Sequence, residues 1–496
     1  MDDPGPGFEA RLGALAKALH GERIVRTHAA VVILSRDRAW KMKQPVRLGY
    51  LDFSSVEQRH HALERELHLN RRTAPDLYLA LHPVSEGNGR LELDGAGKTV
   101  DWLLEMRRFP DGALLENMAL EGPLDPDLLL LLADRVAAFH ATAPLRPGND
   151  GAARIASVIA GNRESLGRFP EVFAAADVAR LLGRQEALLS ERSHLLDARA
   201  ASGRVRHGHG DLHLGNIALI DGVPTPFDCL EFSDDLATTD TLYDIAYLLM
   251  DLWRCGDGTG AGLVLNRFLD RMPEDEGGWP LLPLFLSLRA TIRAHVLAAA
   301  GNMEEARMRL ALAEQVLQPQ QSRLGAIGGL SGSGKSTIAR ALGGLGGPPG
   351  GRVVRSDVVR KQRAGVALEE RLAESHYTPA ETARVMAEVA SRLAAVLAVG
   401  GVAIADTMHA RRGDREAVET LAQSAGVMFT GIWLDVPLKL RLMRVEARIG
   451  DVSDADREVA LRQEEITVGD LGRWHRVDAS GPVDSVIAKV LGLLSG

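Results

Sequence analysis

The segment HGHGDLHLGN, residues 207–216, combines side chain types that two kinds of chemistry use. Its histidines and Asp211 could bind a metal ion that activates water. Alternatively, Asp211 and Asn216 could serve phosphoryl transfer, because they are five residues apart. That chemistry needs a carboxylate that accepts the proton of a hydroxyl and, one turn further on, an amide that binds Mg²⁺.

The spacing fits a metallo-hydrolase less well. Metallo-hydrolases of the β-lactamase fold use H-x-H-x-D-H, whereas Leu212 separates Asp211 from His213 in this sequence. Zinc ligands must converge at about 2.0–2.1 Å, and one additional residue disrupts that convergence. The next histidine along the sequence is His295. The spacing therefore favours phosphoryl transfer, with Asp211 as the expected base.

A second metal carboxylate is expected after a short hairpin. Asp228 follows Asn216 by twelve residues, beyond the segment IALIDGVPTP. Asn216 and Asp228 are therefore the predicted Mg²⁺ ligands. The acidic segment EFSDD (231–235) would favour a cationic acceptor such as an amino sugar if it lines the site, but a solvated acidic loop is the simpler interpretation.

A nucleotide site of this kind also needs a lysine on a strand and a helical glutamate that pairs with it. The segment AWKMK places Lys41 and Lys43 on the same face of a strand, and we expect Lys41 to contact the phosphates. The segment ALERELHLNRR offers Glu64 and Glu66, and we expect Glu66 to be the partner. The alternative for these residues is an ion pair on the surface.

The segments HGDLHLGN and FDCLEF resemble the catalytic and metal-binding loops of aminoglycoside phosphotransferase-like (choline-kinase-like) enzymes. The segments KMKQPVRLGYLDFSSVEQR and LNRRTAPDLYL resemble a bacterial branch of that family that is often fused to a P-loop kinase. The resemblance covers about residues 20–310. Two features differ from protein kinases: Cys-Leu instead of Phe-Gly follows Asp228, and THAAVV (27–32) stands in place of a glycine-rich loop.

The second half of the chain contains a phosphate-binding motif. The segment GLSGSGKST matches G-x-x-x-x-G-K-S/T between a predicted strand and a predicted helix. Lys335 would reach the β- and γ-phosphates, and Ser336 would bind Mg²⁺. The predicted nucleotide-binding residues of this loop are Gly329, Leu330, Ser331, Gly332, Ser333, Gly334, Lys335, Ser336 and Thr337.

The remainder of this half resembles small-molecule P-loop kinases of the gluconate kinase and zeta-toxin type. VVRSDVVRK places Asp357 at the end of a predicted strand, and VAIADTMH places Asp406 at the end of another. The resemblance implies that Asp357 faces the acceptor hydroxyl and that Asp406 holds Mg²⁺ from a Walker-B-like position. It also implies that Arg444 and Arg448 belong to a lid over the transferring phosphoryl group.

The elements that must position these residues fall into two groups. Apolar hairpins and a helix between residues 29 and 109 are followed by helical patterns up to about residue 316. After the polar segment QPQQSR (318–323), short apolar strands alternate with helices. We therefore expect an α+β protein-kinase-like bilobal domain over residues 1–317 and an α/β P-loop domain with a parallel sheet over residues 324–496.

The composition indicates which partners and which compartment the protein has. The 496 residues carry 58 Lys+Arg and 66 Asp+Glu, a net charge of −8, so we expect no nucleic acid or membrane partner. Two cysteines and the absence of a signal-peptide pattern favour the cytoplasm. The apolar segment 281–300 contains Arg289 and Arg293 and is expected to be a buried helix.

Together these features predict an enzyme with two ATP- and Mg²⁺-dependent kinase modules. Each module would transfer the γ-phosphoryl group to a hydroxyl of a small metabolite, such as a sugar or an amino sugar. In the alternative, only the N-terminal module is catalytic. The P-loop half would then be a nucleotide-gated regulatory module, or a toxin-like kinase held by the first half.

Overall fold

The computed structural model of the chain describes residues 6–27, 29–48, 51–87, 89–447 and 452–495. The chain divides into two compact units. The first unit comprises residues 1–122, 138–148 and 200–245, and the second comprises residues 123–137, 149–199 and 246–496. The boundary expected at residues 318–323 therefore does not coincide with the division into units, and it stays a prediction.

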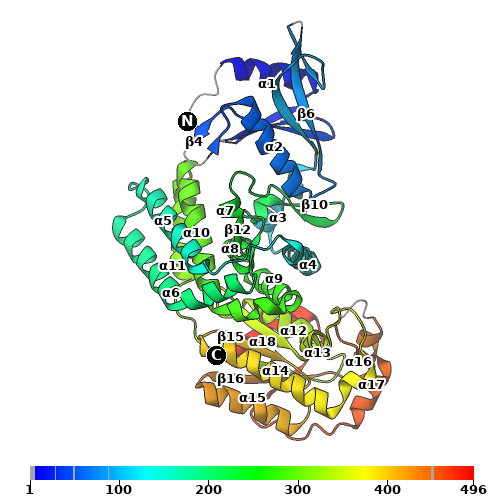
Figure 1. The fold of residues 1–496 in the computed structure, drawn as a ribbon. Coiled ribbons are helices and arrows are strands. Elements are labelled where there is room, and N and C mark those ends of the chain that lie inside the picture. The colour runs from blue at the N-terminus through cyan, green and yellow to red at the C-terminus, as the bar shows by residue number, and fades with distance from the viewer. Residues whose placement is uncertain (1–5, 28, 49–50, 88, 448–451, 496) are drawn as a thin grey trace. The chain divides into compact units, whose positions relative to one another are not determined.

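The first unit is built on a six-stranded antiparallel sheet (Figure 1). Its strands, in spatial order, are β1 (Arg23–Arg26), β2 (Ala30–Leu34), β3 (Arg38–Lys43), β8 (Lys98–Arg107), β6 (Tyr78–Gly87) and β7 (Arg90–Leu93). Side chains alternate between the two faces of a strand. Leu103 of β8 accordingly packs with α1 (Pro6–Ala18), whereas Leu104 packs with Leu63 of α2 (Val56–Asn70). The two helices thus cover opposite faces, and the predicted hairpin and helix are confirmed.

The first unit also contains the segment that carries the histidine-rich motif. It includes α3 (Leu115–Glu121), β9 (Val205–His207), the 3₁₀ turn η2 (Leu214–Asn216), β10 (Ile217–Ile220), β11 (Val223–Pro226), α7 (Asp234–Ala237) and β12 (Thr238–Asp240). The short hairpin expected before Asp228 is present, and its turn is tight because VPTP is itself strand β11. Only Asp221 and Gly222 form the turn, and both have positive φ, as a two-residue hairpin loop requires.

The second unit begins with helices, as the sequence predicts. They are α5 (Gly151–Gly167), α6 (Ala175–Ala201), α9 (Gly258–Arg271), the 3₁₀ segment η3 (Pro273–Leu281), α10 (Leu282–Ala299) and α11 (Met303–Gln315); α4 (Pro126–Thr142) and α8 (Thr241–Arg254) each have residues in both units. The run Pro273–Ala299 is long and apolar enough to cross a membrane by length and composition, and 72% of its most apolar window is buried within the fold.

The second unit ends in a five-stranded parallel sheet with helices on both faces (Figure 1). The spatial order is β14 (Gly351–Arg355), β15 (Val402–Asp406), β13 (Arg323–Gly328), β16 (Met428–Asp435) and β17 (His475–Asp478). The first four confirm predicted strands. Strand β17 was not predicted from the sequence, because it is a short strand, HRVD, in which only Val477 is buried.

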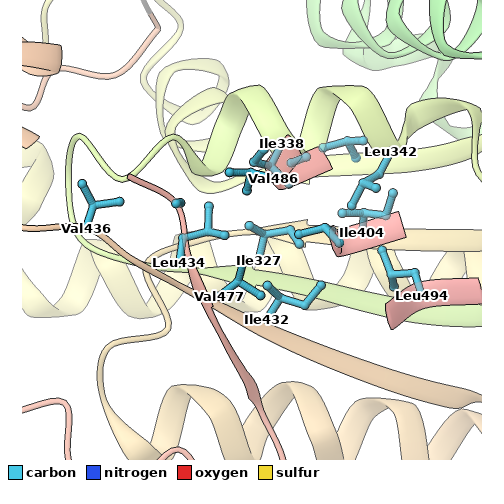
Figure 2. Packing of buried hydrophobic residues seen from close by; sticks show 14 residues of the cluster. Ile327, Ile338, Leu342, Ile404, Ile432, Leu434, Val436, Val477, Val486 and Leu494 are labelled. Carbon is cyan, nitrogen blue, oxygen red and sulfur yellow. The ribbon is translucent and has the colours of Figure 1, made fainter. Parts of the chain in front are cut away.

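A compact apolar cluster holds this sheet to α12 (Lys335–Ala341) and α18 (Val483–Ser495). Figure 2 shows the side chains of the strands interleaved with those of the two helices, among them Ile327, Ile404, Ile432, Leu434, Ile338, Val486 and Leu494. Each fully buried aliphatic side chain contributes roughly 1.5–3 kcal/mol to folding. The cluster therefore fixes the strand ends from which the phosphate-binding loop and Asp406 project.

Within the second unit, helix α9 packs against β14, the strand at one edge of the parallel sheet. The Asn266 side chain accepts a hydrogen bond from the Val353 amide at 2.7 Å and donates to the Gly351 carbonyl at 2.9 Å. The helix approaches closely because Gly262 lacks a side chain. A Cβ on Gly262 would lie 2.1 Å from the carbonyl carbon of Gly343, which no structure tolerates without movement.

A buried arginine strengthens the same contact. The Arg352 guanidinium, with 1% of its side chain exposed, makes two hydrogen bonds of 2.7 Å to Glu276 and one of 3.1 Å to Asp270. Planar, two-point pairing of this kind is the strong arrangement for an arginine and a carboxylate. Since β14 leads directly into the helix that carries Asp357, these contacts fix where that residue lies.

Candidate functional site

Asp211 and Asn216 contact each other directly in the first unit. The Asn216 Nδ2 donates to the Asp211 carbonyl and to Asp211 Oδ2, both at 3.0 Å. The amide oxygen of Asn216 then faces away from this contact. The short turn η2 between the two residues allows the contact, since it brings residue 216 back over residue 211.

Backbone hydrogen bonds join this loop to the segment that contains Asp228. The Phe227 amide donates to the Asn216 carbonyl, and the Leu230 amide donates to the His209 carbonyl, both at 2.9 Å. The His209 ring contacts the Phe227 carbonyl through Nε2 at 3.0 Å. The structure thus brings Asp211, Asn216 and Asp228 to one place, although they are separated by the hairpin β10–β11.

Asp244 supports the loop as a structural hydrogen bond acceptor. Its carboxylate accepts hydrogen bonds from the amides of His209 and Gly210 at 2.8 and 2.9 Å. The buried His140 ring lies 2.9 Å from the same carboxylate. Burial lowers the pKa of His209, which therefore stays neutral and acts as a brace for the loop.

Lys41 and Glu66 meet beside Asp228. The Lys41 Nζ donates to Glu66 Oε1 at 2.5 Å and to Asp228 Oδ1 at 2.7 Å. Burial alone would lower the pKa of Lys41, but the charges of Asp228 and Glu66 outweigh it and raise the pKa well above its ordinary value. Glu66 is fully buried, whereas Glu64 is exposed, so Glu66 is the glutamate at this site.

Asp228 has an unusual backbone that aims its carboxylate at the lysine. Its φ of 61° is rare for a residue with a side chain, and its amide donates to the Tyr78 hydroxyl at 3.1 Å. Burial would raise the pKa of Asp228, but Lys41 outweighs burial and lowers it, so the carboxylate is ionised at neutral pH.

The acidic segment 231–235 is solvated only in part, because Glu231 is buried whereas Asp234 and Asp235 are exposed. Glu231 is buried and pairs with Lys43, at 2.5 Å from its Nζ. Asp234 pairs with Arg65 at 2.5 Å. The sequence alone gave Lys43 no role once Lys41 was preferred, and no local signal links it to a residue 188 positions away.

The three histidines of the motif contact different partners. The His207 ring lies 3.2 Å from Asp234, the His209 ring contacts a backbone carbonyl, and the His213 Nε2 lies 3.4 Å from Asp211 Oδ2. Within the described ranges, no three His, Cys, Asp or Glu side chains gather as a metal site would require. His213 is thus a neighbour of the expected base.

The phosphate-binding loop of the second unit has the backbone that its glycines predict. Gly329, Gly332 and Gly334 have φ values of 148°, 83° and 90°, which residues other than glycine rarely adopt. A Cβ on Gly332 would lie 2.4 Å from the Arg441 carbonyl oxygen. The Lys335 Nζ donates to the Leu330 carbonyl at 3.3 Å, within the same loop.

The other residues expected in this loop lie where the motif puts them. Ser331 and Ser333 are in the turn, and the Ser331 amide donates to the Gln463 side chain at 2.7 Å. Ser336 and Thr337 follow in the first turn of α12, Ser336 partly buried and Thr337 exposed. No local pattern predicts the contact with Gln463, which lies in a distant segment of the chain.

Asp406 and Asp357 lie at the same edge of the parallel sheet as this loop. Asp406 is the last residue of β15 and lies opposite Ile327 of β13. Ile327 precedes Gly329, the first residue of the loop, by two residues. Arg355, opposite Asp406 on β14, forms a buried ion pair with it at 3.3 Å. Asp357 follows two residues later in the first turn of α13 (Ser356–Ala364). Ligands of open parallel sheets bind at this carboxyl edge.

Tyr377 and Asp454 are further residues near Asp357 that sequence reasoning missed. The Tyr377 hydroxyl donates to Asp454 Oδ2 at 2.6 Å, and Lys361 lies 3.0 Å from Asp454 Oδ1. Burial, the hydrogen bond to Asp454 and the charge of Asp357 together raise the pKa of Tyr377. The phenol therefore stays protonated and can act as a hydrogen bond donor.

The expected lid arginines have different surroundings. Arg444 of α16 (Leu438–Glu446) donates to the Ala479 carbonyl at 2.9 Å, and its guanidinium lies 3.8 Å from where a Cβ on Gly334 would be, beside the phosphate-binding loop. Arg441 is buried and donates to the Ser331 carbonyl. Arg448 lies outside the described residues.

Known proteins are similar to part of this chain or to nearly all of it. A family model described as an AAA domain matches residues 324–466. An uncharacterized protein of Mycobacterium tuberculosis is 31% identical over 474 residues, which are 92% of this chain and 92% of the relative.

Two solved structures are among the similar folds. A gluconokinase from Sinorhizobium meliloti is 19% identical and covers 36% of this chain and 94% of its own, with a TM-score of 0.27. The GDP complex of aminoglycoside 2'-phosphotransferase-IIIa is 15% identical and covers 62% of this chain and 98% of its own, with a TM-score of 0.36.

The Mycobacterium tuberculosis protein matches this chain along nearly its whole length. In this chain the region with the antiparallel sheet precedes the region that contains the parallel sheet and the P-loop, and the AAA-domain model matches most of the latter. The chain belongs to the family of the full-length Mycobacterium tuberculosis relative.

Proposed function

We propose that the chain is an ATP-dependent phosphotransferase in which two modules each transfer a γ-phosphoryl group to a hydroxyl of a small metabolite. The observation that carries the proposal is the convergence of Asp211, Asn216 and Asp228 with the Lys41–Glu66 pair. Phosphoryl transfer needs little covalent chemistry from the protein, but it needs a base, metal ligands and a phosphate-binding cation in one place.

In the first module Asp211 accepts the proton of the acceptor hydroxyl. Asn216 holds one Asp211 oxygen at 3.0 Å and so orients the base. Lys41 binds the phosphates, and Glu66 keeps the ammonium group of Lys41 directed at them. A general base of this kind contributes about 10²- to 10⁴-fold to the rate.

The donor set fits Mg²⁺. The carboxylate of Asp228 and the amide oxygen of Asn216 are oxygen ligands, which Mg²⁺ prefers, and the Asn216 nitrogen is already committed to Asp211. When bound, the ion neutralises charge on the phosphates. Lys41 also contacts Asp228, so the lysine and an ion at this site would share the same carboxylate.

In the second module the loop 329–337 binds the phosphates of ATP. Lys335 contacts the β- and γ-phosphates, Ser336 and Asp406 hold Mg²⁺, and Asp357 faces the acceptor hydroxyl. Arg444 lies beside the loop and stabilises the transferring charge. The oxygen donors of Ser336 and Asp406 suit the ion, although Asp406 is paired with Arg355.

The acceptors we propose are sugars or amino sugars in the cytoplasm. Within the described part of the chain the two cysteines form no disulfide, in keeping with a reducing compartment. Because Glu231 is buried and paired with Lys43, it does not serve as an anchor for a cationic acceptor. An amino group on the acceptor would therefore need another partner.

The test is ATP turnover and product formation with a panel of sugars, using Asp211→Asn and Lys335→Ala separately. We expect Asp211→Asn to abolish one phosphorylated product, with a loss of about 10²-fold or more. Lys335→Ala should abolish the other. If Asp211→Asn keeps full phosphotransfer, the assignment of the base is wrong.

The same experiment separates the alternatives for the P-loop half. If Lys335→Ala leaves every product unchanged but alters its rate of formation, the P-loop half is a nucleotide-gated regulatory module. If Lys335→Ala changes neither products nor rates, the two-kinase proposal fails.

A further inference from the structure

A second lysine lies beside the Lys41–Glu66 pair and has no part in the proposed mechanism. Lys43 follows Lys41 by two residues on β3, so strand alternation puts both ammonium groups on the same face. The Lys43 Nζ lies 2.8 Å from Glu66 Oε2 and 2.5 Å from Glu231 Oε1. Only 3% of its side chain is exposed. Lysines are almost never buried to this degree unless they are paired.

Glu66 is thereby shared by two lysines through different oxygens. Its Oε1 accepts from Lys41, and its Oε2 faces Lys43. An ammonium group has three hydrogens, of which Lys41 directs one to Glu66 and one to Asp228. Because Lys43 occupies the other Glu66 oxygen, Glu66 holds Lys41 from one side only. The Lys41 hydrogens on the side of Asp228 can then turn to a phosphate oxygen.

Glu231 balances the second lysine. Burial and the positive charge of Lys41 would lower the pKa of Lys43, but Glu66 and Glu231 outweigh both effects and raise it. The cluster therefore contains three carboxylates and two ammonium groups, with one negative charge in excess. Asp228 is its exposed member, at 40% of the side chain, so the excess charge lies where a metal ion would bind.

The Lys43–Glu231 pair also ties the metal-binding segment to the sheet. Glu231 comes three residues after Asp228, and Arg65 of α2 donates to its backbone carbonyl at 2.9 Å. The pair thus joins β3, α2 and the segment after Asp228 at one buried point.

We propose that Lys43 and Glu231 are positioning residues for nucleotide binding in the first module: they fix Glu66 and the Asp228 segment so that Lys41 can exchange Asp228 for a phosphate. The inference rests on the proposed function, because it assumes that Lys41 binds the phosphates of ATP. Neither residue touches the reacting atoms.

The test measures binding of a non-hydrolysable ATP analogue with Mg²⁺ by calorimetry, in the full chain carrying Lys335→Ala so that the P-loop is silent. The variant Lys43→Met with Glu231→Gln removes both charges together, which avoids an unpaired buried charge. We expect binding to weaken by about 10- to 100-fold, the range for residues that orient a direct ligand. The fold, followed by thermal unfolding, should be retained.

A matched control removes another buried ion pair, which joins α2 to the antiparallel sheet of the first unit. Arg59 of α2 and Asp101 of β8 are paired at 2.9 Å and are 3% and 0% exposed. The variant Arg59→Met with Asp101→Asn should bind the analogue as the parent does. If both double variants weaken binding equally, the effect is a general loss of packing and the positioning role is overturned.

Glu231→Gln alone keeps the inference testable if the double variant does not fold. Glutamine keeps an acceptor for Lys43 but leaves its charge unbalanced beside Lys41, so binding should weaken several-fold. Binding equal to that of the parent would overturn the positioning role. Absence of binding in the parent, with no further change on Lys41→Met, would instead overturn the proposed function itself.

Discussion

Replacing Arg352 by methionine should loosen the strand that leads to Asp357. Methionine has a similar length and fills the space, but it donates no hydrogen bond. Glu276 and Asp270 would then remain in the interior of the second unit without the guanidinium that now contacts them at 2.7 and 3.1 Å. Arg392 is 3.9 Å from Glu276, too far for a hydrogen bond, and cannot replace it.

The expected cost is large because one partner of a buried cluster is removed. Such changes destabilise by about 3–5 kcal/mol, since a charge is left buried without compensation. This corresponds to roughly a 10²- to 5 × 10³-fold increase in the equilibrium constant for opening of β14, at about 1.4 kcal/mol for each tenfold change.

The cost should also depend on pH. Burial would raise the pKa of Glu276, but Arg352 outweighs burial and lowers it. A carboxyl with a lowered pKa in the folded state stabilises the fold above its unfolded pKa, about 4.3. That contribution is lost as the pH falls through the folded-state pKa. The difference between the native chain and Arg352→Met should therefore be largest at neutral pH and should shrink in acid.

Hydrogen–deuterium exchange of the peptide spanning residues 351–358 measures this opening directly. A triple variant, Arg352→Met with Asp270→Asn and Glu276→Gln, should recover most of the protection, because no buried charge stays unpaired. Arg412→Met removes an exposed pair with Glu416 and should leave the exchange of β14 unchanged. Exchange of β14 in Arg352→Met at the native rate, at neutral pH, would refute the reasoning.

Two further perturbations follow from the backbone and from a titrating side chain. Gly332→Ala should abolish nucleotide binding by the P-loop, because the φ of 83° costs an alanine about 1–2 kcal/mol and its Cβ would clash with the Arg441 carbonyl; ATP binding at native affinity in a titration would contradict this. Burial would lower the pKa of His82, but Asp94 and Glu105 outweigh it and raise the pKa. The imidazolium therefore stabilises the fold below its unfolded pKa of about 6.5, and the contribution is lost as the pH rises through the folded-state pKa. His82→Gln should lower Tm more at acidic than at alkaline pH, and an equal change at both would contradict the assignment.

The sequence predicted which residues lie close together where their proximity depends on local spacing. Asp211 and Asn216 are one short turn apart, so their contact follows from five residues of chain. The alternation of β3 correctly placed Lys41 and Lys43 on one face. Alternation could not decide which of the two lysines contacts the phosphates, because it does not show which residues lie opposite each lysine. The structure adds that both lysines contact Glu66, so the choice between them was incomplete.

Long-range pairing of charges was the part that could not be predicted. Glu231 looks like a member of an acidic surface loop, and only its distant partner Lys43 makes it a buried residue. Arg352 likewise stands in a short strand whose pattern gives no sign of Glu276. Buried charges are decided by partners far away in the chain, and a single sequence does not contain that pairing.

The close approach of Gly262 to Gly343 limits how this chain can be recombined with others. A gene fusion made at residues 318–323 would carry η4 (Leu342–Gly344) and β14 away from the helix that fits them, and most helices have a side chain where Gly262 has none. A transplanted piece would therefore need to begin before α9, near residue 258, to bring its own complementary surface. The unit that can be exchanged intact is larger than the P-loop motif and its sheet.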